Sequence, residues 1–276
     1  MTGQRIGAVA IAYPRGELPF LGEWLEYHLT LGVSHVFLAL HVNEDLVPTN
    51  QYLPVKRPYP PMYELDLTEA DVLRATFAEI RPFKSHVTTY LLHRSGPQEF
   101  LGPVHTQARL YNEVLAQQRT SFDWIAPFDV DEYLVPQPPF ESIPAALASY
   151  PPDVGAVEME QVIVTPRWDE ERRPRPRPLL VPNLARCSKI VPARHGMKTI
   201  ARARATTSLH VHTHQLVEGS KVGSDRRILT YHLRGFPAQT EIEWGYRLPI
   251  EHQEYDLIDD RPWRLLHDAL RPDVAS

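Results

Sequence analysis

The stretch Trp124-Ile125-Ala126-Pro127-Phe128-Asp129-Val130-Asp131-Glu132-Tyr133-Leu134 carries the strongest signal in this chain. An apolar run rich in aromatic residues ends in three carboxylates, those of Asp129, Asp131 and Glu132, before apolar character returns. Such a run is typical of a buried strand, and the carboxylates are costly to bury unless a cation or basic partner compensates them. If the strand continues through Asp129 and Asp131, alternation places both on one face, where a divalent metal could bridge them to a phosphate. A strand that ends in a polar turn, with its aspartates capping the next element, fits the pattern equally well.

The residues nearest the N-terminus predict parallel strands. Residues 6–12 are a continuous apolar run suited to a buried strand, and residues 33–40 are a second one. A turn is expected over residues 13–17. Between the turn and the second strand, residues 20–31 repeat apolar side chains at three- and four-residue steps, which predicts an amphipathic helix that ends near Gly32. A strand, a helix and a strand in this order form a βαβ unit with parallel strands.

The pattern of alternating elements continues up to the carboxylates. Residues 48–61 read as a loop, and Thr68 is expected to cap the helix that follows it. Residues 86–92 predict a strand, and a helix is expected from about residue 105 to residue 118. Because ligand sites lie at the carboxyl ends of parallel strands, the carboxylates after residue 128 are placed where a site is expected.

The second half of the chain has a different pattern, with several predicted strands and a single short helix. A short helix is predicted over residues 142–150, and a charged, proline-rich segment at residues 168–178 reads as a mobile loop. Strands are predicted at residues 155–164, 185–191, 198–202, 208–214 and 227–233. We therefore expect one α/β domain over residues 1–276, with a mostly parallel, Rossmann-like central sheet flanked by helices and a mixed, loop-rich C-terminal half.

Composition excludes some classes of function. The net charge of −5 gives no reason to expect bulk attraction to nucleic acid or to anionic lipid. Cys187 is the only cysteine, so no intrachain disulfide can form and the chain suits a reducing compartment. The apolar run near the N-terminus is too short for a membrane-spanning helix. These features predict a cytoplasmic protein whose contact with membranes, if it has one, is peripheral.

Histidines in the second half offer another metal-binding pattern. If residues 208–214 are one strand, His210, His212 and His214 share a face that could bind a metal. A polar strand face near the surface explains the same spacing. His232 lies at the end of an apolar run. It is either a packed side chain or a third metal ligand beside Asp129 and Asp131, which form a D-x-D pattern.

Several segments, kept in one order along the chain, resemble a known family. They are residues 20–28 (Phe-Leu-Gly-Glu-Trp-Leu-Glu-Tyr-His) with 31–35, a helix with Gln107 and Tyr111-Asn112, residues 124–134, Lys198-Thr199-Ile200, the His210/His212 stretch and Tyr231-His232. Together they resemble glycosyltransferase family 92 and the related family-2-like transferases, which share the GT-A fold. Two departures stand out. Only Glu17 is left to correspond to the family's Lys-Asn-Glu triplet, and His41 stands where a nucleotide-contacting carboxylate is usual.

The resemblance implies a metal-dependent glycosyltransferase of the hexosyltransferase type, acting in polysaccharide or glycoconjugate synthesis. It would move a sugar from a nucleotide-diphosphate sugar, with a UDP-sugar as first candidate, to a hydroxyl of a glycan or glycoconjugate acceptor, with inversion. Residues 1–135 would bind the nucleotide-sugar and residues 136–276 the acceptor. Asp131 would bind Mn²⁺ or Mg²⁺, with Asp129 on the metal or the donor ribose and His232 as a third ligand. The donor site would further include Glu17, Gln107 and Asn112.

The remaining roles leave alternatives open. Inversion needs a general base near the acceptor hydroxyl, for which Glu160 is the first choice and Glu158 the second, with Glu241 and Glu243 as alternatives. Each of these carboxylates could equally be a solvent-facing strand residue. A non-catalytic sugar- or nucleotide-binding module of the same fold is one rival function. A metal-dependent hydrolase or oxygenase built on the three histidines, holding Zn²⁺ or Fe²⁺, is another.

Overall fold

The computed structural model describes residues 3–12, 14–41, 68–92, 103–166, 184–191, 198–210, 212–224, 226–233, 257–258, 261 and 264–265. The loop expected at residues 48–61 and the mobile loop expected at residues 168–178 lie outside the described residues, as do Glu241 and Glu243. Among the helices of the described part, none is both long enough and apolar enough to cross a membrane.

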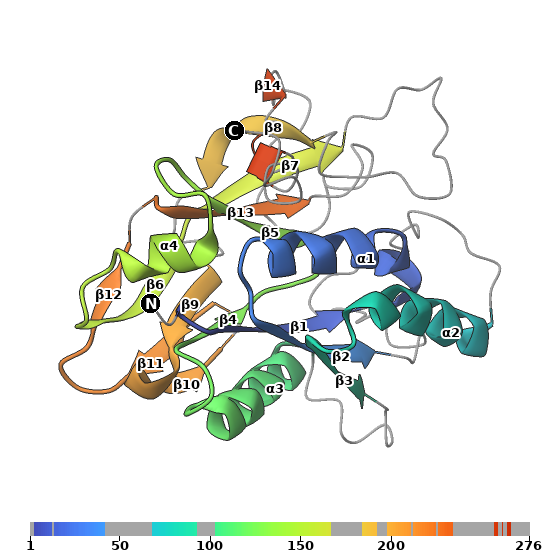
Figure 1. The fold of residues 1–276 in the computed structure, drawn as a ribbon, viewed down its shortest axis with the longest axis horizontal. Coiled ribbons are helices and arrows are strands. Elements are labelled where there is room, and N and C mark those ends of the chain that lie inside the picture. Colours follow the sequence, from blue (N-terminus) through green and yellow to red (C-terminus); the bar gives the residue numbers. More distant parts are fainter. Residues whose placement is uncertain are drawn as a thin grey trace, which may run out of the picture.

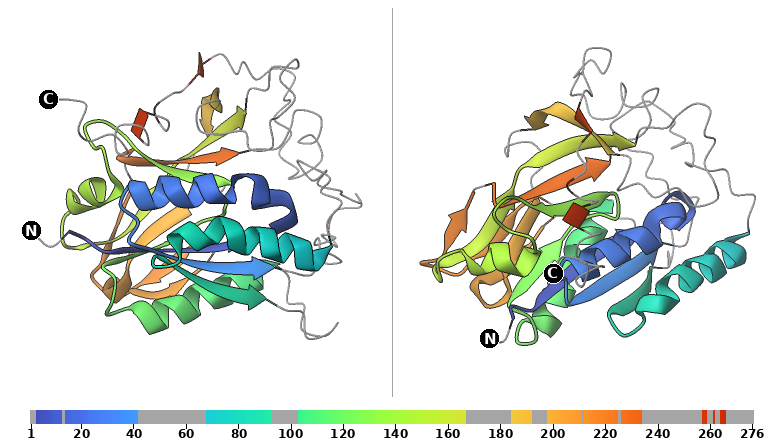
Figure 2. Two further views of the ribbon diagram at one scale, coloured as in Figure 1. Left: turned by 45° about the vertical axis from the view of Figure 1, so that its right-hand side comes forward. Right: turned by 45° about the horizontal axis from the view of Figure 1, so that its top comes forward.

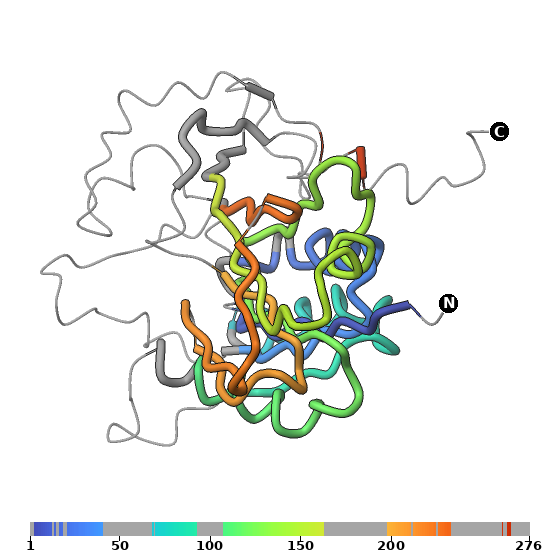
Figure 3. The backbone as a smooth tube through the Cα atoms, turned by 90° about the vertical axis from the view of Figure 1, so that its left-hand side faces the viewer, coloured from blue at the N-terminus to red at the C-terminus, as the bar shows by residue number. Residues whose placement is uncertain are grey.

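A seven-stranded sheet in the order β12-β6-β9-β4-β1-β2-β3 forms the centre of the molecule. Its strands are β1 (Ile6–Ala12), β2 (His35–His41), β3 (Val87–Leu92), β4 (Trp124–Pro127), β6 (Val154–Met159), β9 (Lys198–Arg202) and β12 (Lys221–Gly223). Strands β3, β2, β1 and β4 are parallel to one another, whereas β9 is antiparallel to both β4 and β6. The predicted mostly parallel central sheet is therefore confirmed. Strand β12, in the orange part of the tube in Figure 3, runs parallel to β6 at the edge of the sheet.

Three helices cover the two faces of this sheet. Helices α1 (Pro14–Thr30) and α2 (Glu69–Ile80) lie on one face, and α3 (Pro103–Gln118) lies on the other (Figures 1 and 2). Alternation along β1 serves both layers, because its even-numbered residues pack in the cluster with α1 and residues 9 and 11 pack with α3. A strand buried on both faces needs a continuous apolar sequence, and residues 6–12 provide it. Thr68 caps α2 as expected, since its Oγ1 accepts a hydrogen bond from the N–H of Asp71 at 3.2 Å.

A second sheet lies on the far side of α1 (Figure 1). It has the order β14-β8-β7-β13-β5, with β5 (Glu132–Pro136), β7 (Gln161–Pro166), β8 (Leu184–Val191), β13 (Ile228–Leu233) and β14 (Leu257–Ile258). The smaller elements are η2 (Arg81–Phe83), α4 (Ile143–Ala148), η5 (Ala203–Ala205) and the hairpin of β10 (Thr206–Leu209) with β11 (His214–Leu216). Apolar residues of α1 and of β5 and β13 belong to one core cluster, so α1 is packed between the two sheets.

Three expectations about individual elements were wrong, and the choice left open after Trp124 is resolved as a strand that ends in a polar turn. The strand that begins at Trp124 ends at Pro127, and the carboxylates follow in a turn closed by the hydrogen bond from Glu132 N–H to Asp129 O. The strand expected at residues 155–164 breaks at Glu160, so that β6 and β7 join different sheets. Residues 208–214 turn back on themselves as a hairpin. Helix α1 begins at Pro14 instead of after a turn, because proline fits the first helical turn, where its missing N–H is not needed.

Candidate functional site

The turn that carries Asp129 and Asp131, here called the D-x-D turn, lies where the order of the strands in the parallel sheet reverses. From β1 the chain adds β2 and β3 on one side and then crosses over to place β4 on the other side of β1. Phe128, just beyond β4, is tied to β1 by its N–H, which donates to Val9 O at 3.2 Å. Asp129 and Asp131 therefore follow the carboxyl end of a central strand at a topological switch point, where ligands bind in open α/β sheets.

Three aromatic side chains of α1 hold the strand that follows this turn. Trp24 Nε1 donates to Glu132 O at 2.8 Å, and the Tyr27 hydroxyl donates to Leu134 O at 3.2 Å. His28 accepts the N–H of Leu134 at its Nε2, at 3.2 Å. The Glu-Trp-x-x-Tyr-His motif and the D-x-D-E motif, about a hundred residues apart in sequence, are thus one structural unit.

His28 is neutral in this arrangement. Its Nδ1 donates to Trp24 O at 2.9 Å while its Nε2 accepts from Leu134, so the hydrogen-bond network assigns the proton to Nδ1. The ring is fully buried against Trp24 and Phe128, with centroid distances of 4.7 and 4.8 Å. Burial lowers the pKa of His28 from 6.5 to about 3, although its hydrogen bond to the backbone of Trp24 opposes the shift.

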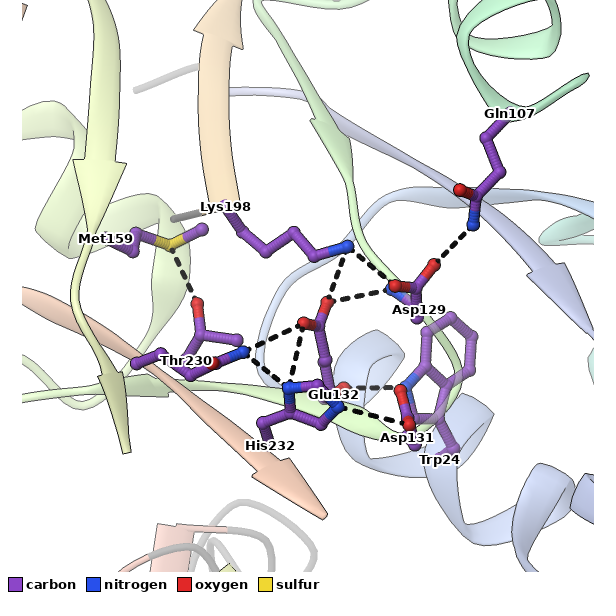
Figure 4. A network of polar contacts seen from close by, with 10 residues as sticks. Trp24, Gln107, Asp129, Asp131, Glu132, Met159, Lys198, Thr230 and His232 are labelled. Carbon is purple, nitrogen blue, oxygen red and sulfur yellow. Dashed lines mark hydrogen bonds and ion pairs between the residues drawn. The ribbon is translucent and has the colours of Figure 1, made fainter. Parts of the chain in front are cut away.

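Lys198 reaches the turn from the first residue of β9 (Figure 4). Its Nζ lies 2.7 Å from Asp129 Oδ2 and 3.2 Å from Glu132 Oε2, and its side chain is only 2% exposed. Burial disfavours the charged form of Lys198, but the carboxylates of Asp129 and Glu132 outweigh burial and hold the pKa of Lys198 above its ordinary value. Burial likewise raises the pKa of Glu132, and the Lys198 ammonium opposes that rise. This buried ion pair joins the turn to β9.

A chain of polar contacts leads from Glu132 to Asp131 (Figure 4). Gln161 Nε2 donates to Glu132 Oε1 at 3.3 Å and also contacts Nδ1 of His232. The Nε2 of His232 lies 3.2 Å from Asp131 Oδ2. With Nδ1 accepting from the amide of Gln161, His232 carries its proton on Nε2 and donates it to Asp131. His232 and Asp131 therefore act as a hydrogen-bonded pair.

The structure brings only some of the predicted donor-site residues to the turn. Gln107, on α3, donates from Nε2 to Asp129 Oδ1 at 3.0 Å, as an element of the same cluster. Asn112 instead joins α3 to the hairpin, since its side chain bonds both the N–H and the C=O of Leu209 at 2.9 and 2.7 Å. Glu17 lies in the first turn of α1, which follows the carboxyl end of β1.

The two candidate bases lie at the end of β6. This strand runs in the same direction as β4, because both are antiparallel to β9. Glu158 and Glu160 are thus at the carboxyl edge of the central sheet, as the D-x-D turn is. Glu160 accepts from Arg226 Nε at 2.8 Å, and Glu158 is close enough to His214 to oppose the fall in the pKa of His214 that burial causes.

The three histidines do not share a strand face. His210 and His212 are exposed in the turn between β10 and β11, where the N–H of His210 donates to Thr213 O at 2.8 Å. His214 begins β11 and pairs with Leu209. Within the described part of the chain, no three His, Cys, Asp or Glu side chains are grouped so that they could hold a metal ion. The geometry that favoured a histidine metal centre is therefore absent.

Sequence reasoning missed the roles of Lys198, Glu132 and Gln161 in this cluster. The signal for Lys198 was its place at the head of the strand of residues 198–202, because a lysine is almost never buried without a carboxylate partner. Its partners could not be named, since they follow a strand some seventy residues earlier in the chain.

Comparisons with known proteins leave the family open. No family model matches the chain, and no curated protein matches it. Among solved structures, the crystal structure of HddC from Yersinia pseudotuberculosis matches over 83% of this chain and 93% of that chain, with 11% sequence identity and a TM-score of 0.37. A likeness at this level supports no conclusion about the function of this chain.

Proposed function

We propose that this protein is a GT-A-type glycosyltransferase, related to family 92, that transfers a sugar with inversion from a nucleotide-diphosphate sugar to a glycan or glycoconjugate hydroxyl. A UDP-sugar is the first candidate donor. The observation that supports this most is the place of the D-x-D turn beyond β4, beside β1, where strand order reverses. A donor's diphosphate bound in that crevice would meet the carboxylates of the turn directly.

The residues of the turn fit a divalent metal through Asp131. Carboxylate oxygens suit Mn²⁺ and Mg²⁺, and Mg²⁺ is commonly held by one or two carboxylates completed by substrate phosphates. Both oxygens of Asp129 already accept from Gln107 and Lys198, and His232 orients Asp131 in the manner of a supporting group. A metal bound there would neutralise the charge that builds on the leaving diphosphate. Asp129 and His232, two of the three predicted ligands, thus become positioning residues in this proposal.

The acceptor is proposed to bind between the carboxyl edge of the central sheet and the second sheet. Glu160 lies at the junction of β6 and β7, where the chain passes from one sheet to the other. Its ion pair with Arg226 keeps the carboxylate in one place, and an inverting reaction needs one such base at the acceptor hydroxyl. Glu160 is therefore the proposed base, with Glu158 as the second choice.

The test is a thermal-shift titration with UDP, GDP, CDP and dTDP, each with and without Mn²⁺. A ligand at about 100 times its Kd stabilises the native state by about 2.7 kcal/mol, which raises Tm by several degrees. We expect one nucleotide to raise Tm only with Mn²⁺ and the rise to vanish in Asp131→Asn. Asp123→Asn is the matched control, because its carboxylate lies at the opposite end of β4, bonded to the N–H of Arg5.

Two outcomes would contradict the proposal. If no nucleotide changes Tm, or if the rise persists in Asp131→Asn, the D-x-D turn is not the donor site. Stabilisation without release of the nucleoside diphosphate from any sugar donor would favour a non-catalytic binding module.

A further inference from the structure

Lys198 has a role in the proposed donor site that goes beyond stabilising the fold. We propose that the ammonium of Lys198 permanently takes the place of a metal ion beside Asp129 and Glu132, and so acts as their resident cation. A divalent metal then reaches Asp131 alone and binds firmly only together with the donor's diphosphate. The second part of this proposal rests on the proposed function. The first part can be tested with the metal alone.

The contacts of the two carboxylates support this division of the D-x-D-E motif. Asp129 Oδ2 is 2.7 Å from the Lys198 ammonium, and its Oδ1 accepts from Gln107 at 3.0 Å. Glu132 Oε2 accepts from Lys198 at 3.2 Å and from the N–H of Asp129 at 2.9 Å, while its Oε1 accepts from Gln161 at 3.3 Å. A metal that bound either carboxylate would compete with these donors.

Burial makes displacement of these donors unfavourable. Glu132 has no exposed surface, and the side chain of Lys198 is 2% exposed. Removing one partner from a buried ion pair leaves the other charge uncompensated, which costs several kcal/mol. Asp131 differs because it contacts His232 instead of Lys198; 36% of its side chain is exposed, against 28% for Asp129. The carboxylate of the motif that lies outside the ion pair with Lys198 is therefore that of Asp131.

The charge balance couples the metal to the nucleotide. The motif has three carboxylates, and the single ammonium of Lys198 pairs with two of them, so the motif remains acidic and would repel a diphosphate by itself. A single carboxylate supplies few of the six ligands that Mg²⁺ requires, and phosphate oxygens supply the kind that is missing. The metal and the diphosphate should therefore each strengthen the binding of the other.

The test begins with Mn²⁺ binding to the full chain, followed by electron paramagnetic resonance of the free ion, without nucleotide. In the wild type we expect weak binding that Asp129→Asn leaves unchanged. Lys198→Ala removes the charge and leaves room for an ion, so Mn²⁺ should bind at least about tenfold more tightly. The double variant Lys198→Ala/Asp129→Asn should lose this gain, which assigns the new site to Asp129.

A second variant serves as a control in case Lys198→Ala does not fold. Lys198→Ala leaves Glu132 buried without a counter-ion, whereas Lys198→Ala/Glu132→Gln removes both charges of the pair and should melt at a higher temperature. If neither variant gains Mn²⁺ affinity in the folded state, Lys198 is not the resident cation. Tight Mn²⁺ binding to the wild type that Asp129→Asn abolishes would also overturn the proposal.

The second arm repeats the wild-type titration with a saturating concentration of UDP, GDP, CDP or dTDP. We expect one of them to tighten Mn²⁺ binding at least about tenfold and Asp131→Asn to remove the effect. If no nucleotide has an effect while the Mn²⁺ results hold, the proposed function and the coupling fail, and the role of Lys198 as resident cation stands.

Discussion

His28 makes the stability of this fold depend on pH in a predictable direction. Its ring is buried and neutral, with Nδ1 donating to Trp24 O and Nε2 accepting from Leu134 N–H. Protonation would turn the Nε2 acceptor into a donor facing another donor. The folded state therefore resists protonation of His28, while the unfolded chain takes up a proton near the ordinary pKa of 6.5. Because the unfolded state binds more protons between these two pKa values, stability falls as the pH falls.

The magnitude follows from the two pKa values. The pKa of His28 is lowered from 6.5 to about 3 in the folded state. The contribution of neutral His28 to the free energy of unfolding is therefore almost complete above pH 6.5 and is lost as the pH falls towards 3. Between about pH 7 and pH 5, His28 alone should remove about 2 kcal/mol from the free energy of unfolding. The full loss, reached near the lower pKa, is about 5 kcal/mol.

Urea unfolding followed by tryptophan fluorescence can measure this loss at several pH values. His28→Gln is the matched control, because its amide oxygen can still accept the N–H of Leu134 but does not titrate. Other histidines, such as the half-buried His35, contribute equally to both proteins, so the difference in slope belongs to His28. If wild type and His28→Gln lose stability in parallel between about pH 7 and pH 5, the neutral buried state of His28 is refuted.

Three further substitutions test other parts of the structure. Gly32→Ala should cost about 2–3 kcal/mol in urea unfolding, because φ is +100° and a Cβ would lie 2.6 Å from the ring of Pro144; an unchanged midpoint would contradict this. Asn112→Leu should cost about 1–3 kcal/mol, since it leaves the N–H and C=O of Leu209 unpaired, and should not change nucleotide binding in the thermal-shift assay. Glu160→Gln should slow sugar transfer by about 10²- to 10⁴-fold with the nucleotide-induced Tm rise intact; full activity would exclude it as the base.

Sequence patterns predicted the elements whose surroundings are uniform. The run of residues 6–12 predicted β1 correctly, because a strand buried on both faces needs apolar residues throughout. The helix that contains Trp24 and Tyr27 was predicted from its periodicity, although its first turn was missed. The position of the carboxylates after a strand indicated a site at the sheet edge, where the structure places the D-x-D turn.

Patterns failed where a neighbour distant in sequence decides the conformation. Residues 155–164 read as one strand, but Glu160 marks the place where the chain leaves one sheet and enters another. Alternation within a strand does not reveal which sheet its partner strands belong to. The spacing of His210, His212 and His214 likewise suggested a shared face, which the hairpin abolishes by pairing Leu209 with His214.

The sequence by itself determined the α/β class, the buried strands and the presence of acidic residues at a strand end, because burial and periodicity are local properties of the chain. Only the tertiary structure decided which of those acids is engaged. Lys198 comes from a strand far along the chain to neutralise Asp129 and Glu132, and His232 comes from another to orient Asp131. The charge on a carboxylate is set by whatever lies within a few ångströms of it, and these neighbours are assembled by folding alone.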